Sequence, residues 1–294
     1  MALYRVTIQL TSPLVTPLKG DTIWGHVVWG IANHEGESAV QEFLDGCGGT
    51  EPVFVASSAF PSGFICKPLP APYARKAQLS PDDYAQIKKF KKERYVRASD
   101  YLDVPAPVQD GGENPFKSVV LTHNSMDRFS NTVTDGGLYA VTEQWAKQRD
   151  FDIYIASTYT AERVGQLCGW AFENGYGADA STGRGNFTMT GKAAEVHPKR
   201  GGGEYMALAP FFLPQQSGVT NLRADTFIRN GKIGGAFASI LPPWKKTVVL
   251  YDEGAVFTSD HSLQYVGELL RNMHTDARIC QSGFAPVIPL GEEK

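Results

Sequence analysis

A glycine-rich loop at residues 175–187 constrains the fold of this chain more than any other part of its sequence. It reads Gly-Tyr-Gly-Ala-Asp-Ala-Ser-Thr-Gly-Arg-Gly-Asn-Phe, with one arginine between two glycines. Four glycines allow close backbone approach and positive φ angles, which turn N–H groups toward an anion. The loop therefore predicts a surface that holds phosphate groups. The alternative is a purely structural turn, because glycine clusters also mark ordinary turns.

The elements predicted on either side of this loop exclude two familiar nucleotide-binding motifs. Apolar residues recur at helical spacing over 164–172, before the loop, and residues 186–190 alternate like a strand after it. A dinucleotide-binding loop instead leaves a strand and opens a helix. A Walker loop needs Gly-Lys-Ser/Thr where this chain has Gly183-Arg184-Gly185. We therefore expect an order of helix, glycine loop and strand.

The composition sets wider limits on the kind of protein. A chain of 294 residues predicts two medium-sized domains, and a net charge of −3 argues against a protein that coats nucleic acid non-specifically. No membrane span or secretory signal is visible, so we expect a cytoplasmic protein. The four cysteines, at 47, 66, 168 and 280, lack the spacing of a metal site and are expected to be free thiols.

The order of the predicted elements suggests two related halves. Residues 4–10 alternate as a strand, Asp21 is placed to cap a helix with apolar residues over 23–31, and residues 53–59 read as a returning strand. A second series of strand, helix, glycine loop and strand begins near Phe151. Short apolar stretches at 205–213, 232–241 and 246–257 predict further antiparallel strands.

Together these elements predict an α+β fold with two ferredoxin-like (RRM-like) β-α-β-β-α-β halves, a projecting thumb insertion and the glycine-rich loop. The first domain is expected over 1–145, with the thumb at about 67–116, and the second over 146–294. The thumb is rich in proline, glycine and charge, and we do not expect it to belong to a core. Its basic run at 88–97 favours RNA phosphate contacts and a solvated helix face about equally.

Three ordered motifs carry a resemblance to a known family. These are residues 20–26 (GDTIWGH), 121–128 (LTHNSMDR) and the glycine loop. From Tyr4 to about Leu250 the chain resembles the RAMP superfamily of CRISPR proteins, and within it the Cas5-like group of the fourth Csm subunit of type III-A effector complexes.

The resemblance implies a non-catalytic RNA-binding subunit for antiviral defence. Such a subunit grips the 5′ handle of the crRNA and docks the large polymerase-like (cyclase-like) subunit and the adjacent backbone RAMP subunit, with no cofactor, metal or membrane. The residues that the resemblance assigns to RNA binding fall in the three motifs: Lys19, Gly20, Asp21, Trp24, His123, Asn124, Ser125, Arg128, Gly175, Gly177, Ser181, Thr182, Gly183, Arg184 and Gly185. On this basis we expect Arg184→Glu to weaken RNA binding while leaving the fold intact.

Two other functions stay open at this point. Some RAMP proteins are metal-independent endoribonucleases that process precursor crRNA, and His26 or His123 would be the general base of such an enzyme. A lone histidine among the apolar neighbours of a helix is more often structural, which favours the binding-only interpretation for His26. The third possibility, a nucleotide-binding enzyme that uses the glycine loop, predicts saturable binding of a mononucleotide.

Overall fold

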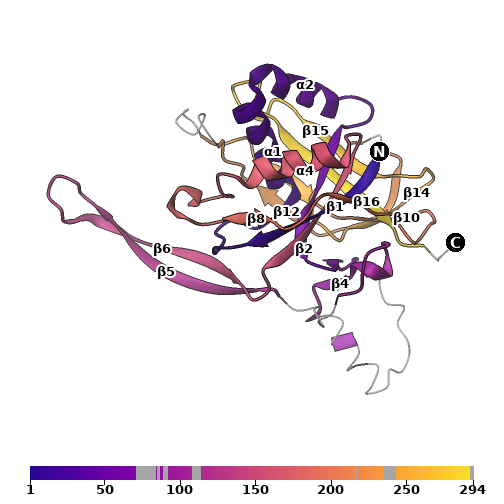
Figure 1. Ribbon diagram of the computed structural model, residues 1–294, viewed down its shortest axis with the longest axis horizontal. Helices are drawn as coiled ribbons and strands as arrows, with labels where there is room; N and C mark the ends of the chain where they lie inside the picture. The colour runs from indigo at the N-terminus through magenta and orange to yellow at the C-terminus, as the bar shows by residue number, and fades with distance from the viewer. Residues whose placement is uncertain are drawn as a thin grey trace.

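The computed structural model describes residues 1–70, 84, 87, 88, 92–107, 114–215, 217–234 and 243–291. Its long helices are α1 (Gly20–Glu35), α2 (Glu37–Cys47) and α4 (Ala161–Phe172), and short 3-10 turns lie at η1 (Ala98–Asp100) and η2 (Ala180–Thr182). Figure 1 shows the three helices gathered on one side of the body. No helix within the described ranges is long and apolar enough to cross a bilayer.

The first sheet is built on the N-terminal strand. Its strands run in the order β2-β7-β1-β8, with β9 also paired to β1, and every pairing is antiparallel. The bounds are β1 (Ala2–Leu10), β2 (Phe54–Pro61), β7 (Asp150–Ser157), β8 (Phe187–Met189) and β9 (Ala194–Glu195). The alternation predicted for β1 is confirmed, because Tyr4, Val6, Ile8 and Leu10 are buried while their neighbours are half-buried.

Helices α1 and α4 cover one face of this sheet and pack closely on each other. Gly30 of α1 lies against Trp170 of α4, where a Cβ would meet the tryptophan side chain at 2.7 Å. The first core lies between these helices and the sheet, and includes Ile23, Val27 and Leu167. Periodic apolar residues on two helices and one sheet face thus produce a single buried layer.

The second sheet comes almost entirely from the C-terminal part of the chain. Its order is β11-β14-β10-β16-β15, again antiparallel. The bounds are β10 (Glu204–Ala207), β11 (Val219–Arg223), β14 (Val256–Ser259), β15 (Tyr265–Leu270) and β16 (Gln281–Pro289). Strand β16 is buried along nearly its whole length, and its Phe284 joins the first core. This strand therefore links the two sheets.

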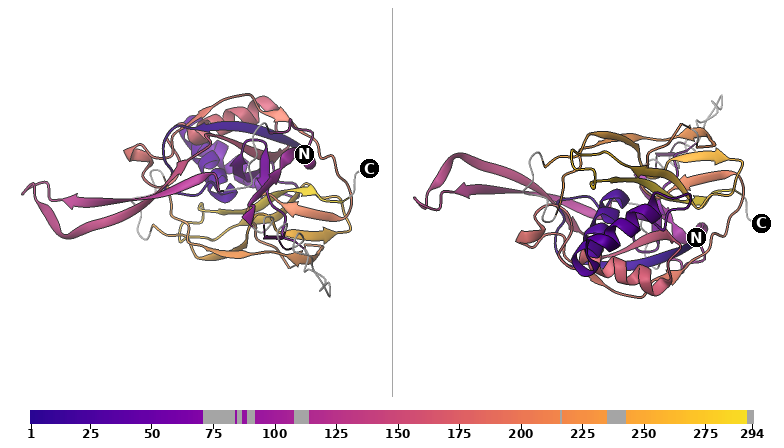
Figure 2. Two further views of the ribbon diagram at one scale, coloured as in Figure 1. Left: turned by 90° about the horizontal axis from the view of Figure 1, so that it is seen from below. Right: turned by 90° about the horizontal axis from the view of Figure 1, so that it is seen from above.

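Three two-stranded ribbons complete the fold: β3 (Phe64–Cys66) with β4 (Tyr95–Arg97), β5 (Phe116–Met126) with β6 (Val133–Ala146), and β12 (Thr226–Arg229) with β13 (Val248–Tyr251). The β5–β6 hairpin extends far out from the body in all three ribbon views (Figures 1 and 2). Its side chains are mostly exposed beyond the root.

The structure modifies the predicted halves. Strand β7, α4 and β8 were predicted for the second half, but β7 and β8 pair with β1 in the first sheet. Beyond Phe172 the described residues form no α-helix. The predicted division between residues 145 and 146 falls at the end of β6, and the two ferredoxin-like halves stay a prediction.

The interpretation of the whole of residues 67–116 as a thumb outside the core is wrong for its described C-terminal part. Ala98, Leu102 and Val104 are buried and pack with β3 and β10 in a second core. They are buried because the chain that follows β4 packs these apolar side chains against residues of β3 and β10. Residues 71–83, 85, 86, 89–91 and 108–113 of the predicted thumb lie outside the described residues, as do residues 235–241 of the strand predicted at 232–241. Within the described part of the chain, the β5–β6 hairpin projects from the body. All four cysteines are free, as predicted, and all four are buried.

Candidate functional site

The glycine loop leaves the end of α4 and runs into β8 through five left-handed residues. Gly175, Gly177, Gly183 and Gly185 have φ angles of 80°, 75°, 88° and 64°, and Asp179 has 61°. Space also requires glycine at two of these positions. A Cβ at Gly177 would overlap Thr16, and one at Gly185 would overlap the Tyr176 carbonyl. The order of helix, loop and strand is confirmed.

The segment between β1 and α1 holds this loop in place. The Gly185 N–H donates to the Pro13 carbonyl at 2.8 Å, and the Ala178 N–H donates to Thr16 Oγ1 at 2.9 Å. The Tyr176 hydroxyl donates to the Pro17 carbonyl at 2.8 Å. These backbone amides therefore already have acceptors inside the protein, and they do not form the open phosphate surface that the glycines predict. Their bonds fasten the loop to the rest of the fold.

His26 of α1 lies directly under the same loop. Its Nε2 accepts the Gly177 N–H at 3.2 Å, and its ring stacks on Tyr176 with 4.8 Å between ring centroids. Burial lowers the pKa of His26 to about 4, although a hydrogen bond with the Ala171 backbone acts in the opposite direction. A neutral imidazole that accepts this bond explains the residue without catalysis.

Arg184 is held by a carboxylate from the hairpin. Its Nε and Nη2 atoms both lie 2.7 Å from Glu143 Oε1, and its Nη1 donates to the Thr182 carbonyl at 2.9 Å. The Glu143 side chain is only 1% exposed, whereas that of Arg184 is 26% exposed. Arg184→Glu would bring two carboxylates together at a buried site. The structure therefore predicts that this substitution destabilises the fold, contrary to the expectation from the sequence.

Lys19 is also engaged inside the protein. Its Nζ lies 2.6 Å from carboxylate oxygens of both Asp252 and Glu253, on the turn between β13 and β14. Ser58 Oγ donates to the second oxygen of Glu253 at 3.1 Å. Burial acts to lower the pKa of Lys19, but the two carboxylates outweigh it and raise the pKa. Lys19 thus joins the first sheet region to the second.

Three further predicted residues at the start of α1 are buried. The Asp21 carboxylate accepts from Arg229 Nη2 at 2.7 Å and from Gln281 Nε2 at 2.9 Å. Helix α1 begins at Gly20 with Lys19 as its N-cap, so the predicted capping role of Asp21 is wrong. Trp24 is 3% exposed in the first core, and Gly20 is buried against β2. These three residues are therefore closed to RNA in this conformation.

The middle motif lies on the projecting hairpin. His123 on β5 is opposite Tyr139 on β6, and their rings stack with 5.5 Å between centroids. Asn124, Ser125 and Arg128 are exposed toward the tip. Since His123 is four residues beyond Val119, the partner of Glu143, it lies about 13 Å along the hairpin from the Arg184 contact.

The exposed predicted residues therefore fall into two groups on one side of the molecule. Ser181, Thr182 and Gly183 lie at the tip of the glycine loop, and the 123–128 residues lie along the hairpin. Glu143 connects the groups, and sequence reasoning missed it together with the hairpin itself. The signal was present, because runs rich in Val, Leu, Thr and Tyr over 119–122 and 138–142 flank a polar turn at 127–132.

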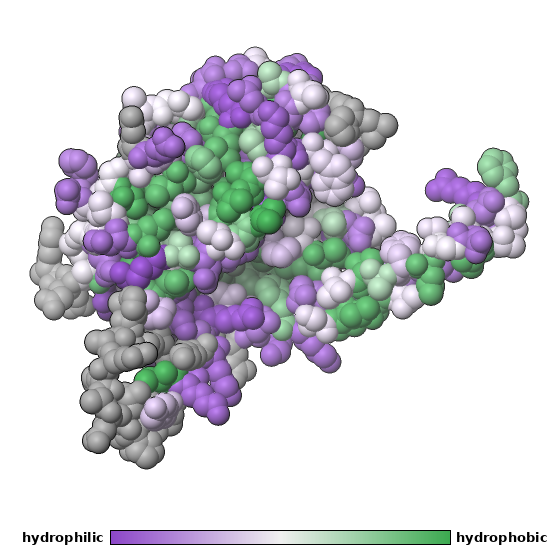
Figure 3. Space-filling model, turned by 180° about the vertical axis from the view of Figure 1, so that it is seen from behind, coloured by the Kyte–Doolittle hydropathy of each residue, from purple (hydrophilic) through white to green (hydrophobic). Residues whose placement is uncertain are grey.

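The hairpin exposes apolar side chains along its length, beside charged and polar residues at its turn. Phe129 in its turn is fully exposed, and Leu138 and Val120 are 70% and 65% exposed. Residues 118–126 contain no Asp, Glu, Lys or Arg. Figure 3 shows hydrophobic side chains gathered along the hairpin. Exposed apolar surface of this kind is typical of a contact site.

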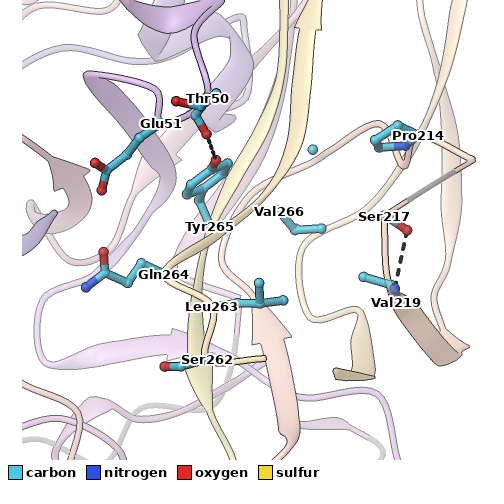
Figure 4. Close-up of a pocket in the computed structure, with 11 residues that line it drawn as sticks. Thr50, Glu51, Pro214, Ser217, Val219, Ser262, Leu263, Gln264, Tyr265 and Val266 are labelled. Carbon is cyan, nitrogen blue, oxygen red and sulfur yellow. Dashed lines mark hydrogen bonds between the residues drawn. The ribbon is translucent and has the colours of Figure 1, made fainter. Parts of the chain in front are cut away.

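Neither a metal centre nor a small-molecule pocket coincides with these residues. Within the described ranges, no three His, Cys, Asp or Glu side chains gather in a way that could hold a metal ion. A cavity of about 600 Å³ lies between the loop at Thr50 and Glu51 and the strand β15 (Figure 4). The Tyr265 hydroxyl donates to the Thr50 carbonyl across one side of it at 2.9 Å. None of the predicted site residues lines this cavity.

Comparison with solved structures identifies the fold. Chains in two crystal structures of a Csm1–Csm4 cassette, in complex with pppApA and with cA4, match with TM-scores of 0.57 and 0.58 at 17% and 16% identity, covering 99% of both chains. A chain of the Csm3–Csm4 subcomplex in the type III-A CRISPR-Cas interference complex matches with a TM-score of 0.53 at 10% identity, covering 99% of this chain and 100% of that one. No family model and no curated protein matches the sequence. Since Csm4 is the component common to these assemblies, this chain has a Csm4-like fold.

Proposed function

We propose that this chain is the subunit of a type III-A CRISPR effector complex that holds the 5′ handle of the crRNA. The observation that carries the proposal is the match to Csm4-containing structures over 99% of the chain. The sequence resemblance in the three motifs supports it independently. We also propose that β1, α1, β2, β7, α4 and β8 form the first ferredoxin-like half, since their strand order is β2-β7-β1-β8.

The two exposed groups are the proposed RNA contacts. Single-stranded RNA is bound through aromatic planes that stack on bases and through polar groups that reach phosphates and base edges. The stacked rings of His123 and Tyr139 offer such a plane, and Tyr139 is 51% exposed. Ser181 and Thr182 are exposed on the same loop as Arg184, where the Thr182 carbonyl accepts from the guanidinium and the Thr182 hydroxyl donates to the Asp179 carbonyl at 2.9 Å. Lys19, Gly20, Asp21 and Trp24 instead make contacts inside the fold.

The proposed protein partners are a large subunit of the Csm1 type and a backbone subunit of the Csm3 type. The matched structures are assemblies of Csm4 with each of these components. The exposed apolar side chains of the hairpin, above all Phe129, are suited to a protein or RNA contact in such an assembly.

We further propose that the chain is not catalytic. The ring of His26 is half-buried beneath the glycine loop and accepts a backbone hydrogen bond, which leaves it poorly placed to take a proton from RNA. Labelled precursor crRNA incubated with the purified protein in a chelator tests this. Discrete cleavage that His26→Ala or His123→Ala abolishes would favour the endoribonuclease.

Assembly is the experiment that tests the main proposal. The chain is coexpressed with Csm1- and Csm3-type subunits and a crRNA, and the tagged complex is purified. Phe129→Ser, which changes a fully exposed side chain, should leave the melting temperature unchanged but reduce the crRNA or partner retained. Lys147→Ser, at an exposed position just past the root of the hairpin, is the control. A chain that copurifies with neither subunit and retains no crRNA would refute the proposed function.

A further inference from the structure

The glycine loop and the projecting hairpin meet at one ion pair. Glu143 lies on β6 near the root of the hairpin, and Arg184 lies in the glycine loop 41 residues later. The guanidinium approaches Glu143 Oε1 with both Nε and Nη2 at 2.7 Å. This contact joins the two exposed groups of predicted RNA-binding residues.

Glu143 itself is fixed from several sides. Its carboxylate is 1% exposed, and Oε2 accepts a hydrogen bond from Trp145 Nε1 at 3.1 Å. The next residue, Gln144, exchanges two backbone hydrogen bonds with Leu14, at 3.0 and 2.7 Å. The same segment accepts the Gly185 N–H through Pro13. The hairpin root and the glycine loop are therefore fastened to one strip of backbone on both sides of the ion pair.

This arrangement leaves part of the Arg184 guanidinium for a ligand. An arginine side chain has five N–H donors in a fixed plane. The Nε–H donates to Glu143 and one Nη1–H donates to the Thr182 carbonyl, while Nη2 lies 2.7 Å from the same Glu143 oxygen as part of the ion pair. N–H donors on Nη1 and Nη2 remain for a ligand, and the Arg184 side chain is 26% exposed. Because the guanidinium is planar, the Glu143 carboxylate bound on its Nε side sets the direction in which the remaining donors point.

We propose that Glu143 is a positioning residue for anion binding by Arg184, so that the root of the β5–β6 hairpin sets the geometry of the glycine loop toward an RNA phosphate. The inference rests on the proposed function, in which RNA approaches this loop. Glu143 touches no phosphate itself. It acts through Arg184, and it couples the orientation of the hairpin to the binding strength of the loop.

Two substitutions of Glu143 separate positioning from charge. Glu143→Gln and Glu143→Ala both raise the net charge of the protein by one, so long-range attraction for RNA is equal in the two variants. Only glutamine keeps an oxygen that accepts from Arg184. In Glu143→Gln the amide nitrogen would face Trp145 Nε1, so this variant also loses the hydrogen bond from Trp145. The Trp145→Phe variant removes that hydrogen bond alone and measures its effect.

The assay is binding of a fluorescein-labelled crRNA that carries its 5′ handle, titrated from 50 to 500 mM NaCl against the full chain. We expect Glu143→Ala to bind at least about 5-fold more weakly than Glu143→Gln, and its salt slope to be smaller by about 0.7, which corresponds to one lost phosphate contact on a single strand. Equal affinity and equal slope in the two variants would overturn the proposal, because charge alone would then explain Glu143. Thermal melts of both variants exclude a difference caused by unfolding.

A second readout does not depend on RNA. The Nε–H of Arg184 gives its own signal in ¹⁵N NMR, and its exchange with water reports the Glu143 contact. We expect slow exchange in the unmodified chain and in Glu143→Gln, and fast exchange in Glu143→Ala. Equally slow exchange in Glu143→Ala would refute positioning. If Arg184→Gln leaves RNA binding unchanged, the phosphate site of the proposed function fails, while the exchange measurement still decides whether Glu143 holds Arg184.

Discussion

Protonation of His26 should loosen the glycine loop at mildly acidic pH. A histidine in an unfolded chain has a pKa of about 6.5, whereas burial under the loop lowers that of His26 to about 4. A depressed pKa contributes stability that is present above pH 6.5 and is lost as the pH falls toward 4. Titration from pH 6.5 to pH 5.0 covers about 1.5 pH units, which at about 1.4 kcal/mol per unit costs about 2 kcal/mol of folding free energy.

A second buried group, Glu253, changes the folding stability with pH in the opposite direction. Its contribution has to be subtracted by comparing two proteins that both contain it. Burial raises the pKa of the Glu253 carboxyl above its usual range, although the nearby Lys19 acts to lower it. A raised pKa stabilises the folded chain at low pH and loses that contribution as the pH rises toward neutrality. The measurement is therefore a difference between the unmodified chain and His26→Gln, which keeps an acceptor for the Gly177 N–H but does not titrate.

Urea unfolding at pH 7.5 and pH 5.0, followed by tryptophan fluorescence, gives the free energy of unfolding for both proteins. On going to pH 5.0, we expect the unmodified chain to lose about 2 kcal/mol more than His26→Gln. A loss equal in the two proteins within about 0.5 kcal/mol would refute the reasoning. Hydrogen exchange of the Gly177 amide checks that the glycine loop itself loosens. After correction for intrinsic rates, this exchange should become faster in acid only in the unmodified chain.

Two further substitutions test how the glycine loop is built. Arg184→Glu places a second carboxylate beside the buried Glu143 and should cost about 3–5 kcal/mol in a thermal or urea melt, whereas Arg128→Glu at an exposed position should change stability by less than about 0.5 kcal/mol. Equal effects of the two would contradict a buried pair. Gly185→Ala should cost about 3 kcal/mol, because φ is 64° and the new Cβ overlaps a backbone carbonyl of the loop. Gly25→Ala, inside α1 with open space around it, should instead stabilise by about 1 kcal/mol, and a loss there would show that the space is occupied.

Local patterns in the sequence were sufficient to predict the helices and strands next to the site. The alternation of residues 4–10 predicted β1, and the helical spacing over 164–172 predicted α4. The predicted order of helix, loop and strand was also enough to exclude the two nucleotide-binding loops. These predictions succeed because burial of one face requires a fixed period in each element. The length of the hairpin was missed because its strands bury little surface, so their pattern is weak.

The sequence did not predict which distant strands and charged side chains pair with each other. The predicted halves divided the chain near residue 145, yet β7 pairs with β1 across that division. Lys19 and Arg184 were both interpreted as free cations for RNA. Lys19 pairs with carboxylates 233 and 234 residues away, and Arg184 with one 41 residues away. No local pattern records such distances, because an ion pair needs only two side chains at the right place in space.

By itself, the sequence determined a mixed fold of helices and antiparallel strands, a glycine loop between a helix and a strand, and three motifs that resemble RAMP proteins. The tertiary structure decided which of the motif residues face solvent. It buried Gly20, Asp21 and Trp24 under two sheets, and it placed His123 on a hairpin that projects from the body. The physical reason is that periodicity fixes which face of an element is apolar, whereas contacts between distant elements fix what covers that face and which charges meet there.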